Sequence, residues 1–64
     1  MLGNFLKTTR LSRNISQGEM AKAIGTSQSY YSLIESGRRK PGYRLINNIA
    51  NYLDVQPSFI RSML

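Results

Sequence analysis

Residues 28–35, QSYYSLIE, carry a run of small, hydrogen-bonding side chains suited to contact another molecule. The Gln28 amide can donate and accept at once, which matches the N6 and N7 edge of adenine in the DNA major groove. Ser29 can reach a base or a phosphate. Ser32 either approaches a base or bonds the carbonyl four residues back in its own helix, and Leu33 either covers a thymine methyl or packs in the core. The segment therefore either contacts DNA bases or is an ordinary solvated helix surface.

Cationic side chains follow this segment directly: Arg38, Arg39, Lys40 and Arg44. They are candidates for contacts to DNA phosphates, because they form a cluster of positive charge next to residues 28–35. Gln17 is a further candidate, because the free N–H groups and positive dipole end of a helix starting there attract a phosphate. Tyr30 either donates a hydrogen bond to a phosphate or is a half-buried surface aromatic. These residues predict a contact surface for a nucleic-acid backbone. The alternative is an ordinary solvated surface of polar and charged side chains.

The composition supports a polyanionic partner and excludes several other classes of protein. Nine Lys and Arg stand against three Asp and Glu in 64 residues, which gives a net charge of +6 and a pI near 10.4. Such a balance favours nucleic acid. There is no cysteine or histidine, so thiolate metal sites, disulfides and the commonest general base are absent. We expect no enzymatic activity, no metal and no cofactor, and a cytoplasmic protein, since neither a membrane span nor a signal peptide is recognisable.

Five helical segments with short connections are predicted to position these side chains, and the fold class is all-α. Their expected ranges are 2–13, 17–24, about 28–36, 43–53 and 57–64. Apolar residues at helical spacing mark the inward side of the first four: Leu2, Phe5, Leu6 and Thr9; Met20, Ala21 and Ile24; Tyr31 and Ile34; Leu45, Ile46, Ile49, Ala50 and Leu53. A chain of this length forms one small domain.

The second and third segments are joined by strong local signals for a tight turn. Ser16 and Glu19 form an S-x-x-E capping box, in which each side chain satisfies a backbone N–H of the other residue. Gly25 can take the positive φ that ends a helix, and Ser27 can cap the next one. Two short helices folded over a turn in this way are the layout of a DNA-reading helix-turn-helix.

Several of these residues together carry a family resemblance: Arg10, Ile15-Ser16-Gln17, Ala21, Gly25, Gln28, Ile34-Glu35, Gly37, and a basic loop ending in Pro41. On these residues, the chain resembles the phage-repressor and Cro family of helix-turn-helix proteins, also called XRE-like or lambda-repressor-like. The resemblance implies that residues 28–36 enter the major groove and that the helix beginning at Gln17 sits over a phosphate. It also implies that Arg10 and Glu35 pair across two helices and are structural, as Ser16, Glu19 and Gly25 are.

The last segment is expected to serve dimerisation. Members of the resembled family often bind two half-sites as a twofold dimer, and an uncapped, apolar final helix suits a self-complementary contact. Phe59, Ile60 and Met63 are the candidate dimer residues, and the expected partner is an operator with paired half-sites. Residues 1–64 form a single DNA-binding domain, either complete or the N-terminal part of a longer protein.

Two functions compete at this point. The first is a sequence-specific, double-stranded DNA-binding transcriptional regulator, a repressor of phage or mobile-element type. The alternative is a protein-interaction module of the same fold, such as an antitoxin-like or anti-repressor partner. The apolar end of the chain favours the alternative, whereas the cations that flank residues 28–36 favour the regulator.

Overall fold

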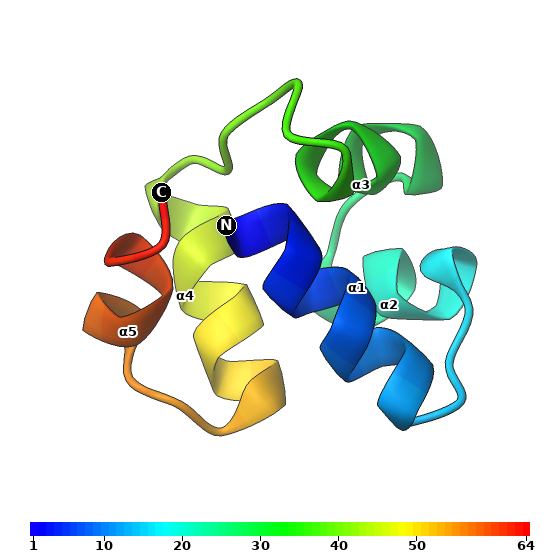
Figure 1. Cartoon of the computed structure of the whole chain (residues 1–64), viewed down its shortest axis with the longest axis horizontal. Coiled ribbons are helices and arrows are strands. Elements are labelled where there is room, and N and C mark those ends of the chain that lie inside the picture. The colour runs from blue at the N-terminus through cyan, green and yellow to red at the C-terminus, as the bar shows by residue number, and fades with distance from the viewer.

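The computed structural model describes all 64 residues and contains five helices and no strand (Figure 1). The helices are α1 (Leu2–Ser12), α2 (Gln17–Ile24), α3 (Gln28–Glu35), α4 (Tyr43–Leu53) and α5 (Pro57–Arg61). None of them has the length and apolarity needed to cross a bilayer. The predicted all-α class and the five-helix order are confirmed.

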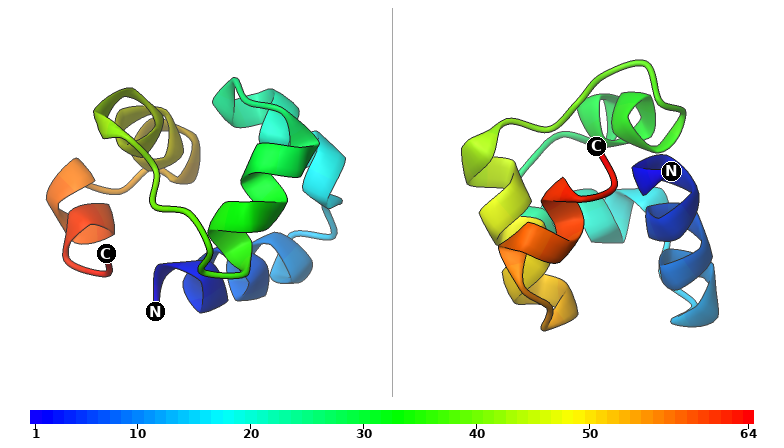
Figure 2. Two further views of the ribbon diagram at one scale, coloured as in Figure 1. Left: turned by 90° about the horizontal axis from the view of Figure 1, so that it is seen from above. Right: turned by 60° about the vertical axis from the view of Figure 1, so that its left-hand side comes forward.

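The five helices form one compact bundle of short elements. α2 contacts both α3 and α4, α1 packs against α3, and α5 folds back onto α4. The longest connection, residues 36–42, arches from α3 to α4 at the edge of the molecule (Figure 1). The two ends of the chain lie close together in every view (Figure 2), and Met1 and Leu64 line the same cavity of about 160 Å³.

All five helices contribute to a single hydrophobic core. Its largest fully buried side chains are Leu6, Met20, Ile24, Tyr31, Ile34, Ile49 and Ile60. In α2, α3 and α4 the buried positions follow the apolar spacing of the sequence. Because each helix is short and exposes one polar face, none of them buries its apolar side without the others.

The turn between α2 and α3 forms from the residues with local signals. Ser16 Oγ accepts a hydrogen bond from the Glu19 N–H at 3.0 Å, and Glu19 Oε1 accepts one from the Ser16 N–H at 2.8 Å. That backbone hydrogen bond lowers the pKa of the Glu19 carboxyl. Gly25 ends α2 at φ 80°, and Ser27 Oγ accepts from the Tyr30 N–H at 3.1 Å. Each of these contacts spans at most three residues, so the sequence alone carries them.

The helix ends differ slightly from the expected ranges. α1 ends at Ser12 and α3 at Glu35, each one residue early, and α5 ends at Arg61 rather than at the chain end. Asn14 stops α1 by taking a left-handed conformation, φ 56°, which asparagine tolerates better than most residues.

α1 packs against α3 more closely than the apolar pattern predicts. Gly3 is buried, and a Cβ at this position would overlap the backbone carbonyl oxygen of Glu35. Arg10 is buried as well, with 8% of its surface exposed, whereas Thr9, which the sequence placed on the inward stripe, is half-buried. The glycine lets the helix backbones approach, and the inward position one residue after Thr9 belongs to a charged side chain.

The expected role of Ile60 in dimerisation is wrong. Its side chain is fully buried in the core, so it has no surface to offer a second subunit. Met63 is half-buried and packs against the core, and Phe59 is 46% exposed with its ring edge-to-face on Phe5, centroids 5.5 Å apart. A helix of five residues has one face for the core, and that face is centred on Ile60. Of the three candidate dimer residues, Phe59 and part of Met63 remain available to a second subunit.

Candidate DNA interface

The outer face of α3 carries the four residues predicted to contact bases. Gln28 and Ser29 are exposed in its first turn, and neither side chain is hydrogen-bonded within the chain. Ser32 makes no bond to a carbonyl of its own helix, unlike Ser36, which donates to the Leu33 carbonyl. Leu33 is half-buried and does not belong to the core cluster. The structure therefore leaves these side chains free for contacts outside the chain.

Tyr30 lies beside this face but uses its hydrogen internally. Its hydroxyl donates to the Lys40 carbonyl at 3.3 Å, and its ring packs against the core. A phosphate oxygen needs a donor, and the single hydroxyl hydrogen is already engaged. Of the two roles considered for Tyr30, this geometry fits the half-buried aromatic, which ties the α3–α4 connection to α3.

The cations that follow α3 are free of anionic partners. Arg38, Arg39, Lys40 and Arg44 are all exposed, and the one ion pair of the chain joins Arg10 to Glu35. One of the nine Lys and Arg is therefore paired and eight are not. The Arg38 and Arg39 N–H groups both donate to the Leu33 carbonyl, at 2.9 and 3.2 Å, which fixes the start of the connection against the end of α3. Charge thus stands unneutralised next to the candidate reading face.

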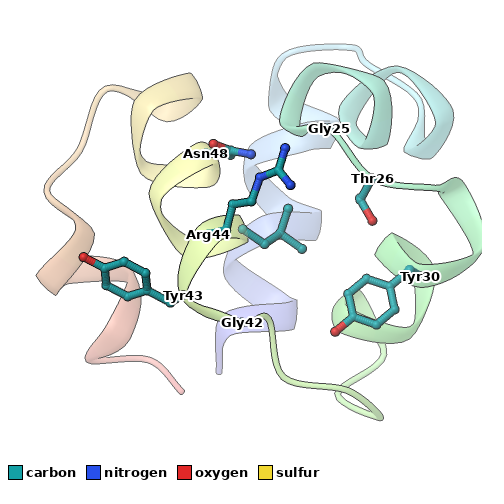
Figure 3. Close-up of a pocket in the computed structure, with 8 residues that line it drawn as sticks. Gly25, Thr26, Tyr30, Gly42, Tyr43, Arg44 and Asn48 are labelled. Carbon is teal, nitrogen blue, oxygen red and sulfur yellow. The ribbon is translucent and has the colours of Figure 1, made fainter.

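A groove of about 320 Å³ separates the α2–α3 turn from the start of α4. Figure 3 shows Arg44 reaching from α4 into this groove toward Gly25 and Asn48, with Thr26 on its other side. Asn48 donates from Nδ2 to the Ile24 carbonyl at 3.1 Å and so caps the end of α2 from another helix. Sequence reasoning missed Thr26 and Asn48. The partner of Asn48 lies 24 residues away, and no local pattern signals such a contact.

A buried polar network holds the helix-turn-helix from behind. Arg10 donates to Glu35 twice, from Nε at 2.9 Å and from Nη2 at 3.2 Å, and its Nη1 donates to the Ile15 carbonyl at 3.0 Å. Gln17 Nε2 also donates to Glu35, at 3.0 Å. One Glu35 carboxylate therefore joins α1, α2 and α3, and one of the two amide hydrogens of Gln17 is occupied inside the protein.

The protonation of this network follows from its surroundings. Burial raises the pKa of the Glu35 carboxyl, but hydrogen bonding, first of all from Arg10, outweighs it and holds that pKa below its ordinary value. The hydrogen bond to Glu35 raises the pKa of the Arg10 guanidinium. Burial likewise raises the pKa of the neighbouring Tyr31 hydroxyl, which is buried and has no hydrogen-bond partner. At neutral pH the network holds one cation, one anion and a neutral phenol.

Comparison with known proteins gives a family match over most of this arrangement. The family model described as Helix-turn-helix (HTH_3) matches residues 6–60, which include α2, α3 and the connection to α4. The matched region thus contains the reading face, the basic connection and the Arg10–Glu35 pair.

Several curated relatives are similar along nearly the whole chain. The ImmF control region 10 kDa protein of Bacillus phage phi105 is 35% identical over 60 residues, covering 94% of this chain and 67% of that protein. The HTH-type transcriptional regulator YqaE of Bacillus subtilis is 33% identical over 60 residues, with 94% and 52% covered. Its YqaF is 38% identical over 53 residues, with 83% and 70% covered. The chain thus spans between about half and about two thirds of these relatives' lengths.

Proposed function

Because this chain belongs to the helix-turn-helix family of DNA-binding transcriptional regulators, we propose that it represses transcription from an operator of phage or mobile-element type. Two relatives support the assignment to a phage or mobile-element type. They are the ImmF control region protein of phage phi105 and the SPbeta prophage-derived regulator YonR, which is 32% identical over 60 residues. The protein acts without catalysis or cofactor, in the cytoplasm, on double-stranded DNA.

The observation that carries the proposed mode of binding is the outer face of α3, which is free of internal hydrogen bonds and is flanked by unpaired cations. In this mode, α3 lies in the major groove and its first turn meets the base edges. Gln28 reads adenine, Ser29 and Ser32 contact bases at close range, and Leu33 covers a thymine methyl.

The proposed contacts to the DNA phosphate backbone surround the outer face of α3. Arg38, Arg39 and Lys40 approach phosphates from the α3–α4 connection, and Arg44 does so from the groove at the start of α4. Gln17 contributes through the free N–H groups of the first turn of α2 and through its second amide hydrogen. These contacts position α3 and carry little sequence information.

Gln28→Ala is expected to weaken binding to the operator by roughly 1–3 kcal/mol and to leave binding to random DNA nearly unchanged, because only a base contact carries sequence information. The measurement is a competition between an operator, selected from a randomised double-stranded library, and random duplex of equal length. Gln56→Ala is the matched control, since Gln56 is also exposed and makes no side-chain hydrogen bond at the start of α5. An equal loss on both DNAs would remove Gln28 from the reading set.

Two copies of the domain are proposed to occupy paired half-sites about 34–36 Å apart, as one helical turn requires. The exposed apolar surface at the end of the chain supports this contact, with Phe59 and Leu64 each 46% exposed and Met63 half-buried beside them. A small patch on so small a domain gives a weak dimer that DNA assembles.

Phe59→Lys is expected to lower cooperativity on an operator with two half-sites more than affinity for one half-site, since a buried charge opposes the contact between subunits. Binding curves on the two DNAs measure the difference. Leu11→Lys is the control, because Leu11 is also an exposed apolar residue, 55% exposed, but lies near the C-terminal end of α1, whereas Phe59 contacts Phe5 near its start. Thermal melts of both variants measure any loss of fold stability, because Phe59→Lys also removes the contact of Phe59 with Phe5. A footprint of one isolated half-site would exclude the dimer.

A further inference from the structure

The amide of Gln28 lies directly against the first turn of α2, at Gly18. A Cβ added at residue 18 would stand 3.1 Å from Gln28 Oε1 and 3.7 Å from its Cδ. Ordinary van der Waals contacts of a Cβ fall between 3.4 and 4 Å, so the amide would have to move by a few tenths of an ångström. The absence of a side chain at Gly18 therefore leaves room for the Gln28 amide in this place.

The backbone does not explain this glycine. Positive φ is confined among the glycines to Gly25 and Gly37, and Gly18 lies inside α2, in its first turn. Glycine is a poorer helix former than alanine, so residue 18 weakens α2 where alanine would support it. A residue that breaks a local rule without a backbone reason is a mark of a functional position. The one close neighbour that a side chain here would displace is Gln28.

The position of this amide matters because base reading depends on orientation. A bidentate contact to adenine needs both the oxygen and the nitrogen of the amide in the base plane at once, and hydrogen bonds weaken steeply as their angles depart from linear. The exposed Gln28 side chain makes no hydrogen bond within the chain, so its proximity to Gly18 is the constraint on the amide that the structure shows. Side chains held in a productive geometry before binding read their partners more sharply than mobile ones.

We propose that Gly18 is a positioning residue for base reading, which sets the reach and tilt of the Gln28 amide from the neighbouring helix. The inference rests on the proposed base contact of Gln28. In this role α2, which lies outside the groove, contributes to sequence specificity through Gln28 and not by contacting a base itself.

Gly18→Ala tests this role. The base position that Gln28 reads is first identified as the one whose preference Gln28→Ala abolishes. Binding of Gly18→Ala is then measured on duplexes derived from the library-selected operator, with each base placed in turn at that position. Discrimination between the preferred and the next base is expected to fall by about threefold or more, as for contacting residues that couple. Thermal stability should hold or rise, because alanine favours the helix. Gly42→Ala is the matched control: Gly42 has φ −76°, and a Cβ there meets nothing within 4 Å.

The double variant separates positioning from a general effect of the methyl group. In a Gln28→Ala background, Gly18→Ala should change affinity for the operator with the preferred base by less than about twofold, since the group it displaces is gone. An equal loss of affinity for that operator in both backgrounds, or unchanged discrimination in Gly18→Ala alone, overturns the positioning role. If Gln28→Ala itself leaves discrimination intact, the base contact fails first, and the positioning role fails with it.

A spectroscopic measurement on the free protein gives a second, independent outcome. The side-chain NH₂ resonances of Gln28 should shift in Gly18→Ala and stay in place in Gly42→Ala. Resonances of Gln28 that do not move in Gly18→Ala would contradict the contact itself, whatever the binding data show.

Discussion

Arg10→Met is expected to lower the free energy of unfolding by about 2–3 kcal/mol, because removing one partner leaves the other as an uncompensated buried charge. Arg10 donates twice to Glu35 and once to the Ile15 carbonyl, and the two charged side chains are only 10% and 5% exposed. Methionine keeps most of the buried length without the charge. For a domain of this size, such a loss is a large part of the total stability. Denaturant titration measures it.

Arg13→Met is the control for this variant, since Arg13 caps the same helix in an exposed position and has no ion pair. Acid dependence gives a further check. The pKa of Glu35 is depressed in the folded protein, so its stabilisation is fully present above the ordinary glutamate pKa and is lost as pH falls through the folded value. The difference between the native protein and Arg10→Met should therefore be largest at neutral pH and narrow in acid. A difference that stays constant with pH would mean that the pair is not the cause.

Affinity for the operator is expected to fall by about four orders of magnitude between 50 and 200 mM salt, with a slope of about −7 in log K against log salt. That slope corresponds to about four phosphate contacts in each subunit of a DNA-bound dimer, at roughly −0.9 per phosphate. Arg38, Arg39, Lys40 and Arg44 are exposed and unpaired, so no internal ion pair must break before they bind.

Arg39→Gln is expected to make this slope shallower by about one per subunit and to weaken binding to operator and random DNA alike, because a phosphate contact is blind to sequence. Arg61→Gln serves as the control, since Arg61 is an exposed cation at the end of α5. Titrations at four or more salt concentrations give the slopes. If single replacements of Arg38, Arg39 and Lys40 all leave the slope unchanged, the connection is a solvated surface and the phosphate contacts lie elsewhere.

The helix-turn-helix could be predicted from the sequence because its signals are local. Ser16 and Glu19 cap one helix within three residues of each other, Gly25 ends it, and Ser27 caps the next. Contacts of that range depend on the chain's own geometry and not on where other helices lie. The same locality places Gln28 in the first turn of α3, on its outer side.

The pairing of Arg10 with Glu35 is a different case. The two residues are 25 positions apart, and neither periodicity nor spacing links them. The pairing was predicted only from the family resemblance, and the structure shows its geometry. The addition of Gln17 to the same carboxylate was not predicted, because its partner lies 18 residues away on another helix and no local pattern signals such a contact.

Helical periodicity determines which face of each segment is apolar, and from this the sequence by itself determined five helices, a single core and a polar, hydrogen-bonding reading face. Tertiary structure decided which side chains meet between helices. It buried Ile60, placed Gly3 against the backbone of α3, turned the Tyr30 hydroxyl to the Lys40 carbonyl and set Gly18 beneath Gln28. The reason is that periodicity fixes the rotation of a residue about its own helix axis, whereas a contact between helices also needs the crossing angle and the distance of closest approach, and those arise only when all five helices pack together.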